Sequence, residues 1–137
     1  MNTILFTPVQ RARLAALADQ VIPAGNGAAS ASEAGISTDL LDRVIVLVPE
    51  RAALLQRVVQ RSATLPPDVA LTTLRERDRA EYDLFCETVA GAYFMSPLVR
   101  DQIRYPGRVP VPARSDIADM EDLIMVVYEA GFAPRQP

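Results

Sequence analysis

Histidine and tryptophan are absent from this 137-residue chain, and cysteine occurs once, as Cys86. Without histidine the chain has no Ser-His-Asp triad, no Cys-His pair and no zinc site with imidazole ligands. A lone cysteine forms neither an internal disulfide nor a cysteine zinc cluster, which fits a reducing compartment. Because the commonest general base at neutral pH is missing, the sequence predicts a protein that is not catalytic by itself.

Positive charge is also scarce, because the formal net charge is −3 and the isoelectric point is about 4.9. A nucleic-acid-binding protein needs a basic surface that displaces counterions from phosphates, so no nucleic-acid partner is expected. The aliphatic run at residues 44–48 is far shorter than the ~20 residues of a membrane-spanning helix. The N-terminus has no basic region, long apolar region or twin arginine. The sequence as written therefore predicts a cytoplasmic protein, or a periplasmic one if an export signal was removed or lies on the partner.

Apolar residues, in contrast, are abundant: half of the chain is hydrophobic and the mean hydropathy is +0.11. A chain of this length forms one domain, expected here over residues 1–137, with a single modest core. A composition this apolar predicts that some hydrophobic surface is left for a partner.

The spacing of the apolar residues predicts an all-α protein, a compact bundle of about six helices with a Pro-rich loop before the C-terminal helix. Thr7 and Gln10 form a capping box with Pro8 at the first helical position. Residues 44–48 would suit a strand, but helix is preferred because no second strand exists to pair with them. The helices are expected at residues 8–22, 37–48, 50–64, 67–75, 78–95 and 116–130, with a short helical segment at 97–104.

Four features resemble functional sites but are better explained by structure. Residues 25–30 contain two glycines and superficially resemble the glycine-rich fingerprint of dinucleotide-binding proteins. The third glycine and the preceding strand of that fingerprint are missing, so a loop is expected. The acids at 116, 119, 121 and 122 compensate the helix dipole, and their spacing matches no Ca²⁺-binding loop. Cys86 lies on an apolar helical stripe, which predicts a buried, inert thiol. Opposite charges alternate along residues 75–81 and predict a self-compensated, solvated face; they are Arg75, Arg77, Arg79, Glu76, Asp78 and Glu81.

Aromatic residues are concentrated between residues 82 and 105. Core packing explains most of them, but Phe94 lies nearly a quarter-turn from Tyr93, and Tyr105 belongs to a Pro-rich segment that cannot be helical. Rigid aromatic side chains are favoured anchors of protein interfaces. The candidate partner interface therefore comprises Tyr93, Phe94, Tyr105, Pro106, Arg108, Val109 and Val111, and no catalytic, cofactor-binding or metal-binding residue is assigned.

Four segments resemble the gluconate 2-dehydrogenase subunit 3 family, in the same order and spacing over most of the chain. They are residues 6–24 (FTPVQRARLAALADQVIPA), 32–36 (SEAGI), 92–100 (AYFMSPLVR) and 103–107 (IRYPG). The resemblance implies a small accessory subunit that stabilises a large flavoprotein of the glucose-methanol-choline oxidoreductase type. FAD and the catalytic histidine then belong to the partner, this chain alone binds no cofactor, and a cytochrome c is a possible electron acceptor.

The leading hypothesis is thus a chaperone-like accessory subunit of a FAD-dependent sugar or polyol dehydrogenase. The substrate of that dehydrogenase would be gluconate, glucose, or a glucoside oxidised at a ring hydroxyl. Many relatives carry a twin-arginine signal that this sequence lacks, which puts an export role in doubt. The alternatives are a stand-alone helical scaffold or homo-oligomer, and an enzyme that uses carboxylates or tyrosine as acid and base.

Overall fold

The computed structural model of this chain describes residues 6–110 and 117–131, and these residues form seven α-helices and no β-strand. The all-α class is therefore confirmed, and the short helical segment expected at residues 97–104 is a helix, Pro97–Gln102, so the described residues contain seven helices where about six were expected. The helices are α1 (Pro8–Val21), α2 (Asp39–Leu47), α3 (Glu50–Ser62), α4 (Pro67–Arg77), α5 (Arg79–Met95), α6 (Pro97–Gln102) and α7 (Ile117–Glu129).

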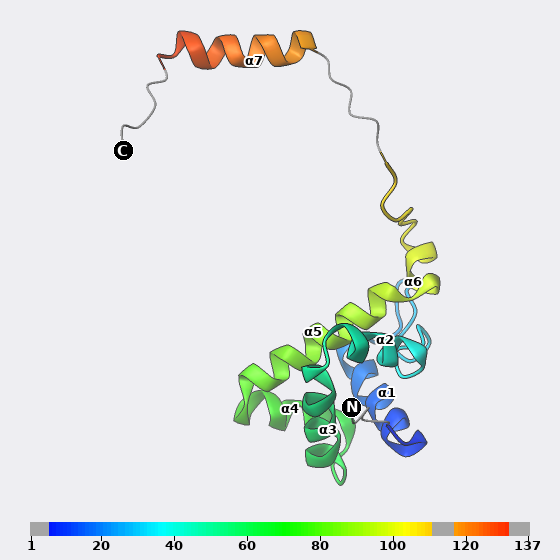
Figure 1. Ribbon diagram of the computed structural model, residues 1–137. Helices are drawn as coiled ribbons and strands as arrows, with labels where there is room; N and C mark the ends of the chain where they lie inside the picture. Colours follow the sequence, from blue (N-terminus) through cyan, green and yellow to red (C-terminus); the bar gives the residue numbers. More distant parts are fainter. Residues whose placement is uncertain (1–5, 111–116, 132–137) are drawn as a thin grey trace. The chain divides into compact units, whose positions relative to one another are not determined.

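The chain divides into two compact units, Met1–Pro106 and Gly107–Pro137 (Figure 1). The first contains α1 to α6, and the second contains α7. The expectation of one domain over residues 1–137 stays a prediction.

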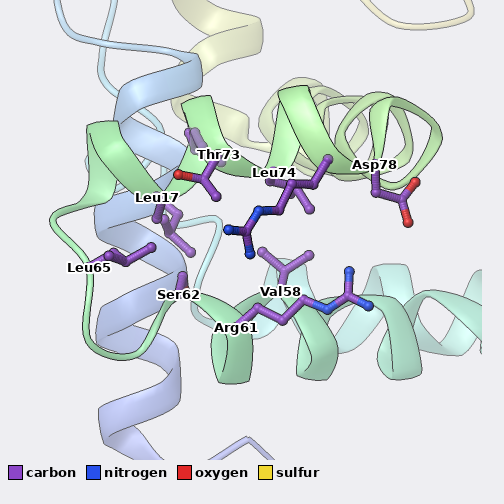
Figure 2. A pocket seen from close by; sticks show the side chains of 11 residues that line it. Leu17, Val58, Arg61, Ser62, Leu65, Thr73, Leu74 and Asp78 are labelled. Carbon is purple, nitrogen blue, oxygen red and sulfur yellow. The ribbon is translucent and has the colours of Figure 1, made fainter.

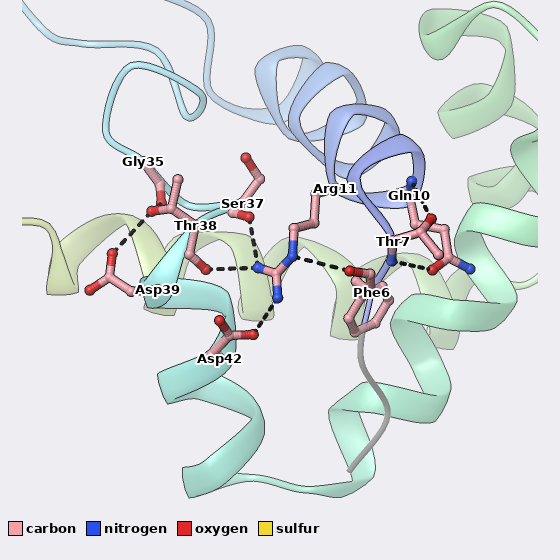
Figure 3. A network of polar contacts seen from close by, with 9 residues as sticks. All are labelled: Phe6, Thr7, Gln10, Arg11, Gly35, Ser37, Thr38, Asp39 and Asp42. Atoms are coloured by element: carbon pink, nitrogen blue, oxygen red, sulfur yellow. Dashed lines mark hydrogen bonds and ion pairs between the residues drawn. The ribbon is translucent and has the colours of Figure 1, made fainter.

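The start of α1 follows the predicted capping box. The amide of Gln10 donates to Thr7 Oγ1 at 3.2 Å, and the amide of Thr7 donates to Gln10 Oε1 at 2.9 Å (Figure 3). Two backbone donors that a helix start leaves without partners are thereby satisfied. The helix ends at Val21, ahead of Pro23, whose ring and missing N–H prevent continuation.

The run at residues 44–48 belongs to a helix, as preferred from the sequence, because α2 extends to Leu47. Val44 is buried, whereas Val46 and Leu47 are exposed. A helix turns successive side chains by about 100°, so a continuous apolar run necessarily places some of them away from the core. This run therefore supplies both core and apolar surface.

Arg11 fastens α1 to the start of α2 (Figure 3). Its guanidinium donates to three backbone oxygens, those of Phe6, Ser37 and Thr38, at 3.0 to 3.3 Å. It also pairs with the Asp42 carboxylate, with Nη2 and Oδ1 2.6 Å apart. The planar arginine head has five donors in a fixed geometry, so this one side chain binds four oxygens and joins α1 to the start of α2.

The core of the first unit is built around α5, which packs against α1, α2, α3, α4 and α6 (Figure 1). Phe85, in the middle of α5, has no exposed surface, and the same holds for Leu17 on α1. Burial of such large apolar side chains is the main favourable contribution to folding, worth roughly 1.5–3 kcal/mol for each one. The bundle is therefore organised by the longest amphipathic helix.

The second unit contains one helix in its described part, α7. Gly131 follows the helix end with φ of +72°, and its amide donates to the Tyr128 carbonyl at 3.2 Å. Glycine suits this position at the end of α7, since its backbone adopts positive φ without steric cost. Within the described ranges, no helix is long and apolar enough to cross a membrane.

Candidate partner interface

Phe94 and Tyr105 both lie at the surface of the first unit, with exposed fractions of 55% and 52%. Arg100 connects them, because its Nε donates to the Phe94 carbonyl at 3.0 Å and its carbonyl accepts the Tyr105 amide at 2.8 Å. Ile103, between them in sequence, is also exposed. The end of α5 and the turn after α6 thus present large apolar side chains whose backbone is held in place.

Tyr93 has a different position from the one expected of an interface residue. Only 7% of it is exposed, and its hydroxyl donates to the Ala29 carbonyl at 2.8 Å. Its ring meets that of Phe94 edge-on, with centroids 5.5 Å apart and planes at 80°. Tyr93 therefore links α5 to the loop after α1, and its ring packs against that of Phe94.

The other predicted interface residues fall on both sides of the boundary between the units. Pro106, at the end of the first unit, is exposed. Arg108 and Val109 are exposed in the second unit, and Val111 lies outside the described residues. A contact of any of these residues with a partner stays a prediction.

A groove of about 570 Å³ lies beside α2 on the first unit. Its apolar part comes from Val46, Leu47 and Met95, and Arg100 reaches it from α6. The other lining residues are Asp39, Asp42 and Arg43, from the first turns of α2. This groove was not expected from the sequence, although the apolar run at residues 44–48 was a signal for it. A continuous apolar run on a short helix leaves apolar side chains on the side that does not face the core.

The last helix carries an even longer apolar run, because residues 123–128 are all apolar. Acids are confined to its beginning and its final residue, Glu129. Among the described residues of the second unit, no other helix is present to cover these side chains. All six side chains of this run are exposed.

The charged segment at residues 75–81 is not the uniform solvated face that its alternating charges predicted. Glu81 is buried, with 6% of it exposed, and it accepts hydrogen bonds from two arginines of α3. The prediction was wrong at Glu81 because alternation in the sequence does not show the neighbouring helix that supplies the counter-charges. Arg75, Glu76, Arg77 and Arg79 are exposed as expected.

Cys86 is half-buried rather than buried, so that part of its prediction was wrong. It lies one helical turn after Tyr82, and a hydrogen bond between the two side chains raises the pKa of the Tyr82 phenol, which burial raises further. The geometry explains the exposure: α5 turns this flank toward solvent, while Phe85 points into the core.

The described part of the chain was also expected to hold no metal site, and its acidic and cysteine side chains are distributed as follows. Within residues 6–110 and 117–131, no three Cys, Asp or Glu side chains gather as metal ligands. Asp116, the first acid of the cluster considered in the sequence, lies outside these ranges, and the side chain of Asp119 is also outside the described part of the structure. Asn26 and Gly27 have positive φ and form a turn closed by Gly25 and Ala28, in agreement with the loop expected there.

Comparisons of the chain with models of protein families, with curated proteins and with solved structures find no match.

Proposed function

We propose that this chain is a non-catalytic binding subunit that stabilises a larger protein, and that α7 is the element with which it binds. The observation that carries the proposal is the run of six consecutive apolar residues at 123–128, on the one described helix of the second unit. An isolated helix of 13 residues is marginal in water, and a helix that is apolar on most sides is found buried. Such a helix becomes stable when it packs into a groove on another protein.

The partner proposed is the FAD-carrying catalytic subunit of a sugar or polyol dehydrogenase of the glucose-methanol-choline type. Support for this finer statement comes from the four sequence segments that resemble the subunit 3 family. Two of them, residues 92–100 and 103–107, contain the exposed Phe94 and Tyr105. FAD and the reacting groups would belong to the partner, and a cytochrome c would accept the electrons.

Stabilisation of the partner requires no chemistry from this chain. A subunit that binds the folded, FAD-loaded flavoprotein and not its unfolded form shifts the equilibrium toward the folded state. At a free concentration a hundred times the dissociation constant, this shift is worth about 2.7 kcal/mol. That is a large fraction of the stability of an ordinary domain.

Co-expression of the flavoprotein with this chain tests the proposal. We expect Ile124→Glu to reduce the yield of soluble, yellow flavoprotein, because a charge is placed on the apolar side of α7. Glu121→Gln is the matched control on the same helix and is expected to leave the yield unchanged. Equal yields of flavoprotein with and without this chain would count against the proposal.

A homo-oligomer is the second candidate, and the same apolar helix favours it, because two copies of α7 can cover each other. Size-exclusion chromatography with light scattering separates the two. A monomer that forms a one-to-one complex with the flavoprotein supports the accessory role. A stable dimer that Ile124→Glu dissociates, and that takes up no flavoprotein, supports self-association.

A further inference from the structure

A second cavity lies in the first unit, far in sequence from α7, and has a volume of about 470 Å³. It is formed by residues of α1, α3 and α4 and of the turns that follow α3 and α4 (Figure 2). Small-molecule sites typically have ~300–1,000 Å³, so the space suits a ligand of modest size.

The two ends of this cavity differ in chemistry. Leu17 and Leu65 lie at one end together with the hydroxyl side chains of Ser62 and Thr73. The charged Arg61 and Asp78 lie toward the other end, with Val58 between them (Figure 2). Leu71 and Leu74 of α4 complete the apolar lining. A ligand that fills it would therefore have an apolar body and one charged end.

The sign of that charge follows from the ion pairs around the polar end. Glu81 is already neutralised by Arg57 and Arg61, which both donate to it at 2.7 Å. Arg77 also lines the cavity and makes no ion pair with any residue in the described ranges. Asp78 is engaged at Oδ1 by the Glu81 amide, 3.0 Å away. Among the residues that line the cavity, the two arginines, Arg61 and Arg77, exceed the one acid, Asp78, by one positive charge, which favours a ligand with one negative charge.

The turn that follows α3 is held by a further arginine. Arg13 of α1 donates to the carbonyls of Ser62 and Leu65, both of which line the cavity. These bonds tie the turn after α3, which contains Leu65, to α1. The wall of the cavity that this turn forms is thus held by hydrogen bonds within the protein.

We propose that this cavity binds a linear monocarboxylate, with its alkyl tail between α1, α3 and α4 and its carboxylate at the guanidinium of Arg77. Arginine binds a carboxylate through two parallel N–H donors, which gives the head a defined position. The tail would cover the apolar surface of Leu71 and Leu74. This site is independent of the proposed partner role, because it involves none of the residues assigned to partner binding.

Titration of the full-length chain with sodium octanoate, followed by ¹H–¹³C NMR of the methyl groups, tests the proposal. We expect saturable shifts of the Val58, Leu71 and Leu74 methyls. Arg77→Gln should weaken octanoate about tenfold, as expected for the loss of ~1.4 kcal/mol of charge-assisted hydrogen bonding. Arg43→Gln, which changes an arginine of the groove beside α2, is the matched control and should leave octanoate binding unchanged.

Two further experiments test whether octanoate binds in this cavity and whether its charge is needed. Thr73→Trp places a large ring in the cavity from a half-buried position and should abolish the methyl shifts, while thermal unfolding shows that the variant is folded. Octan-1-ol has the same tail without the charge and should bind at least tenfold more weakly than octanoate. Absence of saturable shifts with octanoate, equal binding of octanol, or equal binding by Arg77→Gln would each overturn the proposal.

Discussion

Arg57 and Glu81 join α3 to α5, with Nε of the arginine 2.7 Å from Oε1 of the carboxylate. Arg61, one turn further along α3, lies 2.7 Å from the other oxygen. The carboxylate is buried, whereas the arginine side chains are 51% and 59% exposed. The burial of Glu81 is therefore tolerated because two partly hydrated cations satisfy both of its oxygens.

Replacement of this carboxylate should destabilise the first unit. Breaking a fully buried pair costs about 3–5 kcal/mol, and we expect about 2 kcal/mol for Glu81→Ala because the arginines left behind remain in contact with water. Urea unfolding measures the change. The matched control is Asp83→Ala, which removes an exposed carboxylate 2.9 Å from Arg79 and should cost less than about 0.5 kcal/mol. Equal losses for the two variants would contradict the assigned role of Glu81.

The hydroxyl of Tyr93 provides a second test of the core. Tyr93→Phe removes the hydrogen bond to the Ala29 carbonyl and leaves that oxygen without this donor. We expect a loss of about 1 kcal/mol in the free energy of unfolding. Tyr105→Phe, at an exposed position, should change stability by less than ~0.3 kcal/mol, within the range of ordinary surface substitutions. A neutral Tyr93→Phe would show that this loop is not fastened by the phenol.

The Arg11 clamp predicts that arginine cannot be replaced by lysine. Arg11→Lys keeps the positive charge near Asp42 but offers one compact ammonium to four oxygens. We expect about 1–2 kcal/mol of destabilisation. Hydrogen exchange should also become faster at the amides that begin α2. Arg43→Lys, on α2 itself, is the control, and an equal effect there would mean that charge alone matters.

Stability at high pH should depend on Tyr82. Its neighbour Cys86 and burial raise the pKa of its phenol, so the folded-state pKa lies above the value of about 10 in the unfolded chain. The contribution of the neutral Tyr82 phenol to the free energy of unfolding is fully present below about pH 10 and is lost as the pH rises through the folded-state pKa. Unfolding by urea at a series of pH values should show a shallower decline above pH ~10 for Tyr82→Phe than for the natural chain. Parallel declines would exclude this linkage.

Removal of the second unit should separate folding from binding. A chain that ends at Pro106 retains α1 to α6 and the whole described core. We therefore expect its melting temperature to stay within about 3 °C of that of the full chain, which corresponds to a change of less than ~1 kcal/mol in the free energy of unfolding. Its affinity for the flavoprotein should fall at least tenfold, as measured by co-purification at defined concentrations. Retention of full affinity would assign binding to the first unit instead.

Local signals in the sequence determined most of the helices. The Thr7–Gln10 capping box, the prolines at the starts of α1, α4 and α6 and Gly131 after α7 act within one or two turns of the chain, and the helices begin and end near them. The core position of Phe85 was predictable for the same reason, because helical periodicity relates neighbours along the chain.

Tertiary structure alone decided which charged residues are buried and where cavities lie. Glu81 is paired with arginines 20 and 24 positions away, and the cavity beside Arg77 needs three helices. The exposure of Phe94 beside the buried Tyr93 likewise depends on how α5 packs against the loop that contains Ala29. Periodicity and capping are properties of a few consecutive residues, whereas burial and electrostatic pairing arise between segments that only folding brings together.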